Sequence, residues 1–342
     1  MDVMELAERH LVARRRTAAA AVLGAVREWR QLDPRDLSAS WAMNSPRLLA
    51  VVSAGQTAAA ATAQAYTDRA TRLQGVQPEP AGTIAAASFA GFASDGRDLA
   101  SLLYLPVIDT KEAIADGASL AEALAIGERK LRMLVDTEVA DAGRSADGVG
   151  VTANRAVRGY VRMISGGACG RCAVLAGKEY GFNRGFQRHP HCHCTHVPIG
   201  NRTNFRGRTL DARDYFNSLS PAAQNRAFTV AGARAIRDGA DITSVVNARR
   251  GITTTGSWVR DDVTHRGSVV RTGMLGQQLT ITTDSSTRRG MAAQRLRNLD
   301  KDKARGRGAR HVRRLTPEAI YKLAGTDRTE AIRLLHRFGY LY

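Results

Sequence analysis

Residues 119–139 read SLAEALAIGERKLRMLVDTEV, and this stretch carries the firmest helical signal in the chain. Ser119 and Glu122 have the spacing of a capping box, in which each side chain satisfies a free backbone N–H at a helix start. The pattern predicts a helix from 119 to about 139 with one apolar face. That face is formed by residues recurring at helical spacing, namely Leu120, Leu124, Gly127, Leu131, Leu134 and Val135.

The segments on either side of this stretch are also helical in pattern. An apolar stripe runs from Val3 to Trp29, with Arg14 as its one misfit, and it stops before Asp33-Pro34 because proline disfavours a preceding helical residue. An Ala-rich stretch predicts a second helix over 47–73, and a further helix is predicted over 151–163. We therefore expect residues 1–164 to form a helical domain that contacts other proteins.

The charge of the chain is divided unevenly between its two halves. Residues 1–164 contain 19 Lys and Arg and 19 Asp and Glu, whereas residues 165–342 contain 31 and 13, so the whole net charge of +18 lies in the second half. Such asymmetry favours a polyanionic partner, most commonly nucleic acid. No apolar run approaches the roughly 18 residues of a membrane span, and the N-terminus lacks the pattern of a signal peptide. We expect a protein that stays where it is made.

The second half divides into three further segments, so the predicted fold class is α+β and mostly α. A small zinc-knuckle module over 165–200 is followed by a mixed region of helices and short strands over 201–287 and by a basic arm with two terminal helices over 288–342. The predicted helices cover 220–239, 317–323 and 328–338, a short apolar element covers 242–248, and short strands or ordered loops are expected at 252–255, 268–271 and 279–283.

All four cysteines lie within 26 residues, beside four of the eight histidines. A Cys-x2-Cys knuckle, with Gly170 permitting the bend, supplies two thiolates, and the return segment must supply two further ligands to a tetrahedral zinc ion. The preferred set is Cys169, Cys172, His189 and Cys192, with Cys194 in place of Cys192 as a close alternative.

The competing interpretation of the cysteines is a pair of disulfides. A chain without an export signal favours metal over disulfides. Residues in an extended run alternate in direction, so His191, His193 and His196 are interpreted as surface groups or as supports of the ligands. Glu179 is the only carboxylate between the knuckles, which favours a closed structural site over a catalytic one.

The basic arm predicts a contact with the DNA backbone. Residues 288–314 hold 11 basic residues against Asp300 and Asp302, and no aromatic residue. Without aromatic side chains to stack on single strands, phosphate contact that ignores sequence is favoured, although a contact with an acidic protein surface is the alternative. The predicted DNA-binding residues are Arg288, Arg289, Arg295, Arg297, Lys301, Lys303, Arg305, Arg307, Arg310, Arg313 and Arg314.

The Cys/His stretch from Cys169 to Pro198 resembles the minor head proteins of tailed bacteriophages related to the F protein of phage Mu. The His-Pro-x-Cys-x-Cys pattern of that family maps onto His189, Cys192 and Cys194, and His193 departs from the usual pattern, which leaves the ligand choice open. Flanking motifs resemble the versions found in siphophages of actinobacteria. These motifs lie at 228–242, at 246–251 and at 314–321, so that the resemblance covers about residues 150–342.

The resemblance implies a structural virion protein without catalytic activity. Such a protein is made in the host cytoplasm and lies inside the phage head near the portal vertex, where it contacts the portal protein, the major capsid protein and packaged double-stranded DNA. Structural zinc is the expected cofactor.

Two alternatives from other functional classes remain. One is a zinc-stapled nuclease of the His-Asn-His type, suggested by His189, His191 and His193 with Asn183 and Asn201. The other is a zinc-containing, DNA-binding transcription regulator, which predicts a preference for particular sequences.

Overall fold

The computed structural model describes residues 1–184, 189, 192, 194–200, 211–249, 252–254, 258–260, 267–269, 279–282 and 314–341. The chain forms two compact units: unit 1 comprises Met1–Gly166 and Ala176–Thr209, and unit 2 comprises Gly167–Leu175 and Leu210–Tyr342. Helices predominate and strands are few, which confirms the predicted α+β, mostly α class. Among the described residues, no helix combines the length and the apolar character that a membrane span requires.

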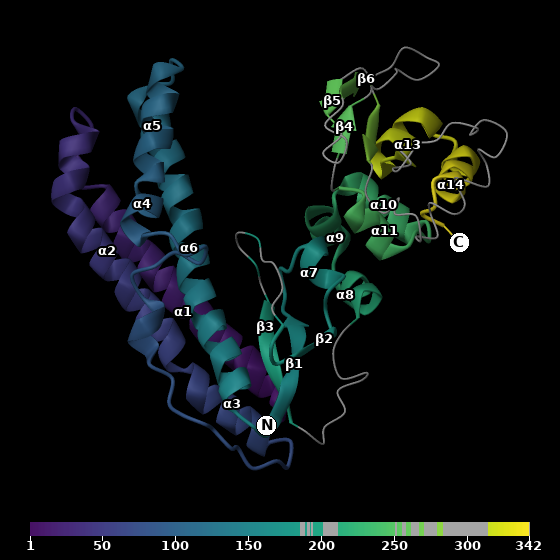
Figure 1. Ribbon diagram of the computed structural model, residues 1–342. Helices are drawn as coiled ribbons and strands as arrows, with labels where there is room; N and C mark the ends of the chain where they lie inside the picture. The colour runs from purple at the N-terminus through teal and green to yellow at the C-terminus, as the bar shows by residue number, and fades with distance from the viewer. Residues whose placement is uncertain are drawn as a thin grey trace. The chain divides into compact units, whose positions relative to one another are not determined.

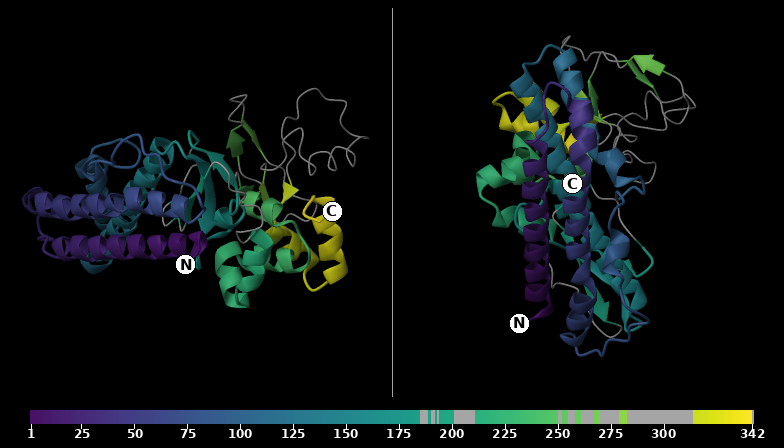
Figure 2. Two further views of the ribbon diagram at one scale, coloured as in Figure 1. Left: turned by 90° about the horizontal axis from the view of Figure 1, so that it is seen from below. Right: turned by 90° about the vertical axis from the view of Figure 1, so that its left-hand side faces the viewer.

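Unit 1 is organised around one long helix, α6 (Leu120–Ala153). Its predicted start is confirmed, because the Ser119 hydroxyl accepts from the Glu122 backbone N–H and the Glu122 carboxylate accepts from the Ser119 backbone N–H. The helix runs beside α1 (Val3–Trp29) and α2 (Leu37–Ala61) and packs on both, as Figures 1 and 2 show. Its end lies well beyond the predicted residue 139.

The core of unit 1 fills the space between these three helices. Leu131, Val135 and Val139 of α6 are fully buried with Leu48 and Val52 of α2. The predicted bounds of α1 are confirmed, whereas α2 begins earlier than predicted, at Leu37, where the side chain of Asp36 caps it. The remaining helices are α3 (Ala63–Arg72), the 3₁₀ helix η1 (Ala86–Phe89), α4 (Leu99–Leu103) and α5 (Leu105–Ala115).

A three-stranded antiparallel sheet completes unit 1, and the predicted helix over 151–163 is wrong. Residues 151–153 end α6, and β1 (Val157–Ile164) follows as the central strand of the order β2-β1-β3. The edge strands are β2 (Glu179–Gly181) and β3 (Cys194–Gly200). Every residue of β1 except Arg158 is buried, so this strand shows no regular alternation of polar and apolar residues.

Unit 2 consists of short helices and short strands. The predicted helix over 220–239 is two helices, α9 (Pro221–Phe228) and α10 (Val230–Arg237), because Thr229 between them has a φ of +67°. The two predicted terminal helices are confirmed as α13 (Pro317–Ala324) and α14 (Arg328–Arg337). The helices α8 (Ala212–Ser218) and α11 (Ile242–Asn247) are also present.

The strands of unit 2 form two small antiparallel sheets. One has the order β4-β7-β8, and the other pairs β5 with β6. Three of these strands, β4, β6 and β7, overlap the predicted β segments, with bounds shifted by one or two residues. The strands are β4 (Ile252–Thr254), β5 (Trp258–Arg260), β6 (Gly267–Val269), β7 (Thr280–Thr282) and β8 (Arg314–Leu315).

Candidate metal site and nucleic-acid interface

The first cysteine knuckle lies at a short helix of unit 2. Cys169 is the N-cap residue of α7 (Gly170–Ala173), and Cys172 lies within that helix and is fully buried. Residues three apart on one helical turn share a side of the helix, so both thiols face the same way. The Tyr215 hydroxyl of α8 donates a 2.8 Å hydrogen bond to the carbonyl oxygen of Ala168 and so fixes the chain just before the knuckle.

Gly170 serves close packing, not the backbone bend that the sequence predicted. A Cβ at this position would lie 3.0 Å from Cδ1 of Phe228 and 3.1 Å from Cγ2 of Val246. Both distances are shorter than ordinary carbon contacts, so a side chain at this position would push against α9 and α11. The neighbouring turn depends on a different glycine, Gly167, which has a φ of +84°.

Three of the five predicted metal ligands come together. The Sγ atoms of Cys169 and Cys172 and an imidazole nitrogen of His189 all lie within 4.8 Å of one another. Zinc–sulfur and zinc–nitrogen bonds of ~2.3 Å and ~2.0 Å separate tetrahedral ligand atoms by roughly 3.3–3.8 Å. Two thiols and an imidazole are also the donor types that zinc prefers, so this cluster could hold a metal ion and fits zinc.

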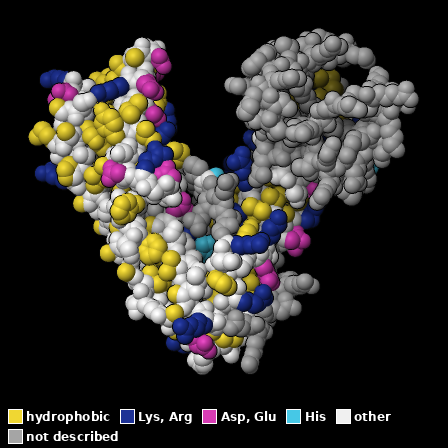
Figure 3. Space-filling view, viewed as in Figure 1, with side chains coloured by type: hydrophobic (Ala, Val, Ile, Leu, Met, Phe, Trp, Pro, Cys, Tyr) yellow, Lys and Arg dark blue, Asp and Glu magenta, His cyan; other side chains and the backbone are white. Residues whose placement is uncertain are grey.

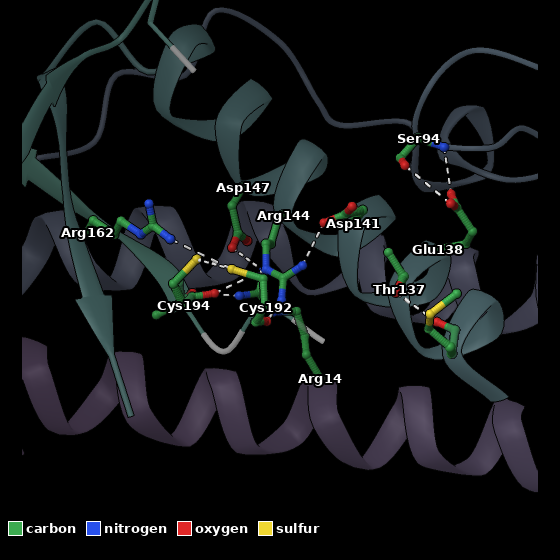
Figure 4. A network of polar contacts seen from close by, with 12 residues as sticks. Arg14, Ser94, Thr137, Glu138, Asp141, Arg144, Asp147, Arg162, Cys192 and Cys194 are labelled. Carbon is green, nitrogen blue, oxygen red and sulfur yellow. Dashed lines mark hydrogen bonds and ion pairs between the residues drawn. The ribbon is translucent and has the colours of Figure 1, made fainter. Parts of the chain in front are cut away.

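The other two predicted ligands, Cys192 and Cys194, lie at the start of β3 in unit 1. Both are buried, and their Sγ atoms are 3.0 Å apart, but they do not belong to the group of three ligand atoms described above. Figure 4 shows the guanidinium groups of Arg144 and Arg162 directed at this dithiol segment. The choice between the two thiols as fourth ligand stays a prediction.

Arg144 of α6 holds the Cys192–Cys194 segment through its backbone. Its guanidinium donates to the carbonyl oxygens of Cys192 and Cys194 and, at 2.6 Å, to the carboxylate of Asp141. Burial by itself lowers the pKa of Arg144, but the negative charges of Cys194 and Asp141 outweigh burial, and that pKa is raised. Arg162 of β1 places a nitrogen 3.8 Å from the Cys192 sulfur. These contacts tie the backbone of the dithiol segment to α6 and place two guanidinium groups beside its thiols.

A second buried network lies beside this one and joins α1, α6 and β3. Arg14 pairs with Asp147 and donates a 2.5 Å hydrogen bond to the hydroxyl of Thr195, and His10 lies 3.0 Å from Asp147. Burial by itself raises the pKa of Asp147, but Arg14 and His10 oppose burial and lower that pKa from 3.8 to about 2. Asp147 is therefore ionised in the folded protein at neutral pH.

Sequence reasoning missed this network, although it marked Arg14 as the misfit on its stripe. The available signal was Arg14 alone, since a buried Arg requires a buried acid; its partner Asp147 lies beyond the predicted end of the helix at 139. Of the three histidines not chosen as ligands, His196 is buried and packs edge-on against Tyr160, with ring centroids 4.3 Å apart. His191 and His193 lie outside the described residues.

The predicted DNA contact at Arg314 is corrected by the structure. Arg314 is fully buried, donates a 2.8 Å hydrogen bond to the carbonyl oxygen of Ser244, and stacks over Tyr340 at 4.3 Å. Its guanidinium therefore holds β8 in unit 2 and is not exposed to a phosphate backbone. The other predicted DNA-binding residues, Arg288, Arg289, Arg295, Arg297, Lys301, Lys303, Arg305, Arg307, Arg310 and Arg313, lie outside the described residues.

Comparison with protein families identifies the family to which the chain belongs. The family model described as VG15 protein matches residues 2–220, which include all of the helices of unit 1 and the whole Cys/His stretch. No curated protein and no solved structure matches the chain.

Proposed function

Because this chain belongs to the VG15 protein family, a family of phage proteins, we propose that it is a structural minor head protein of a tailed-phage virion. In this proposal it is made in the host cytoplasm, is incorporated inside the head, and lies at or near the portal vertex. Its partners there are the portal protein, the major capsid protein and packaged double-stranded DNA. It has no catalytic role.

One coincidence carries the proposal: the family match and the minor-head resemblance overlap over about residues 150–220. The match ends at residue 220 and includes the stretch from Cys169 to Pro198, whose motifs resemble minor head proteins. The same stretch contains the cluster of Cys169, Cys172 and His189. A phage family and a minor-head motif on one segment support a head protein more strongly than either observation does alone.

The surface of unit 1 supports a role in protein contacts. Leu23 of α1 and Met43 of α2 are 62% and 80% exposed, and Ile114 and Leu120, near the α5–α6 connection, are 40% and 44% exposed. Figure 3 shows hydrophobic side chains distributed over the visible face of this unit. Residues 1–164, which include all four of these side chains, carry no net charge, and large exposed apolar side chains there suit a protein partner better than DNA.

We infer that the Cys/His cluster holds a structural zinc ion. Cys169, Cys172 and His189 would supply three ligands, and Cys192 or Cys194 the fourth. Bound zinc would act by cross-linking the segments that carry its ligands, since the free energy of metal binding is also free energy of folding. A closed site with four protein ligands leaves no position for a reacting water.

The first experiment is quantitative mass spectrometry of purified, DNA-filled particles, scaled to the portal subunit. We expect a fixed and low ratio of this protein to the portal protein. Empty heads purified from a packaging-defective infection are the control, because a structural component is present in both. Absence from particles would overturn the proposal and would favour a nuclease or a regulator.

DNA binding is tested separately by salt titration of binding to a duplex. If about six phosphates are contacted, the logarithm of the binding constant should fall with the logarithm of salt concentration with a slope of roughly −5. The same slope is expected for duplexes of unrelated sequence. A flat profile would remove DNA from the proposal, and a strong sequence preference would favour the regulator.

A further inference from the structure

Four arginines lie on three helices of unit 2, and we call them the arginine patch: Arg226 of α9, Arg234 and Arg237 of α10, and Arg328 at the start of α14. Arg226 is exposed on α9, and the other three arginines contact neighbouring side chains of the unit. Arg237 donates a 2.8 Å hydrogen bond to the side-chain oxygen of Gln224 on α9. Arg234 and Arg328 lie 4.0 Å and 3.6 Å from the carboxylate of Asp238.

The positive charge of the patch is largely uncompensated. No carboxylate pairs with Arg226 or Arg237 in the described part of the chain, and the side-chain partners of Arg237, Gln224 and Asn225, are neutral amides. Asp238 is shared by Arg234 and Arg328 at distances that are long for ion pairs, and it also accepts a 2.6 Å hydrogen bond from the Tyr321 hydroxyl. Asp238 therefore contacts two of the four guanidinium groups; of the carboxylates beside Arg328 on α14, Asp327 caps the helix and Glu330 pairs with Arg333.

The patch is accessible and partly ordered in advance of binding. The side chains of Arg234 and Arg328 are 43% and 74% exposed, whereas that of Asp238 is 14% exposed. Arg234 stacks over the ring of Tyr321, with the guanidinium carbon 4.1 Å from the ring centroid. Stacking and hydrogen bonds to neutral groups fix the side chains without neutralising them, which lowers the entropic cost of binding an anion.

The chemistry of the patch favours phosphate over an acidic protein surface. Guanidinium groups match the geometry of phosphate oxygens, and several exposed arginines on helices suit a backbone of repeating phosphates. A protein interface would require large apolar anchors around such charges. In the described part of unit 2, the large hydrophobic side chains that are exposed are Val230 and Ile252, and neither is aromatic.

The patch lies in the same unit as the anchor of the basic arm. Residues 288–313 lead directly into Arg314, which is buried in unit 2 through Ser244 and Tyr340. The arm and the patch are therefore attached to one folded body. When one of two phosphate-binding surfaces on the same body has bound a long polyanion, the effective concentration of that polyanion at the second surface is increased.

We propose that the arginine patch is a second, folded binding surface for the phosphate backbone of double-stranded DNA, independent of base sequence. This inference rests on the proposed contact between the protein and packaged DNA and assigns that contact to residues outside the arm. Asp238 acts within the patch as a built-in competitor, because it holds two of the four arginines that would bind phosphate.

The test measures binding of the full-length chain to a 30-base-pair duplex by fluorescence anisotropy over a range of salt concentrations. The patch variant is Arg226→Gln with Arg328→Gln. The control is Arg27→Gln with Arg129→Gln, which removes the same charge from exposed positions of unit 1. If both patch arginines contact phosphate, the slope of the salt dependence should become shallower by roughly 2, since each contact contributes about 0.9. The control should keep the wild-type slope.

A second variant is expected to bind DNA more tightly, a result that a loss of folding could not produce. Asp238→Asn keeps an oxygen acceptor for Tyr321 and removes the competing charge, so binding should tighten several-fold at low salt. Equal slopes of the salt dependence for wild type and the patch variant, or no gain in DNA affinity in Asp238→Asn, would overturn the proposed role of the patch. Either result would leave binding by the arm intact. Equally tight binding of polyglutamate would also overturn it, in favour of an acidic protein partner. No DNA binding by wild type would overturn both the patch and the proposed DNA contact.

Discussion

Arg14 of α1 and Asp147 of α6 form an ion pair in the interior of unit 1, although 133 residues separate them in the sequence. Their side chains are 4% and 1% exposed. The pair does not stand alone, because His10 contacts the same carboxylate and Arg14 also reaches Thr195 on β3. One buried anion thus aligns the N-terminal helix, the long central helix and the strand that follows the Cys/His stretch.

Removing Arg14 should destabilise unit 1 strongly. Arg14→Met leaves Asp147 buried without its main partner, and breaking a buried pair in this way typically costs 3–5 kcal/mol, i.e. about 4 kcal/mol here. Arg9→Gln is the matched control on the same helix, because Arg9 is 69% exposed and, in the described part of the chain, pairs with Glu5 alone; its effect should stay below about 1 kcal/mol. Urea unfolding followed by circular dichroism measures both. Similar losses for the two variants would show that the buried pair has no special role.

The stability of the protein should depend on the ionisation of Asp147. The pKa of Asp147 is about 2 in the folded protein against 3.8 for the free side chain, so its stabilising contribution is fully present above about pH 4 and is lost as pH falls towards 2. The size of that contribution is about 2 kcal/mol. The difference in free energy of unfolding between wild type and Asp147→Asn should narrow by that amount from pH 5 to pH 2. The exposed substitution Asp116→Asn should give a nearly constant difference, and a constant difference for Asp147→Asn would contradict the prediction.

The start of α6 could be predicted from sequence, whereas its end could not. Its start depends on Ser119 and Glu122, which are neighbours, and local signals of this kind are visible in a sequence. Its last turns contain Asp141, Arg144 and Asp147, which interrupt the apolar stripe. Each of these charges is buried by pairing, and two of them have partners far away in the chain. Periodicity counts such residues as solvent-facing, so the prediction stopped at 139.

The candidate sites also could be predicted only where their residues are neighbours in the sequence. The Cys-x2-Cys knuckle was predictable because its two ligands share one helical turn. The exclusion of Arg314 from the DNA-binding set was not predictable, because nothing local distinguishes it from Arg313. Its burial depends on Ser244, Phe338 and Tyr340, which tertiary folding alone brings together.

Two glycines of α6 should respond in opposite directions to the same substitution. A Cβ at Gly127 would lie 2.1 Å from the Thr110 hydroxyl and 2.5 Å from Cζ2 of Trp29, so Gly127→Ala overpacks the contact with α5 and α1 and should cost about 1–3 kcal/mol. A Cβ at Gly148 meets nothing within 4 Å, so Gly148→Ala should stabilise the helix by about 0.5–1 kcal/mol. Thermal melting of the two variants checks both signs. A loss of stability in Gly148→Ala would contradict this account of α6.

Substituting single cysteines should identify the metal ligands and show that the metal stabilises the fold. Cys169→Ser removes one of two thiols on α7, and we expect loss of bound zinc and a lower melting temperature, because zinc binding contributes directly to folding. Arg171→Ala changes the same four-residue helix without removing a donor and should retain both zinc and stability.

Zinc content measured by elemental mass spectrometry then separates Cys192 from Cys194. We expect the serine variant of the true fourth ligand to lose zinc, whereas the serine variant of the other thiol should keep it. The segment would still be held in place there, because Arg144 binds the backbone carbonyl oxygens of both cysteines and not their sulfurs. Retention of zinc in Cys169→Ser, with unchanged melting, would exclude this knuckle as a metal site.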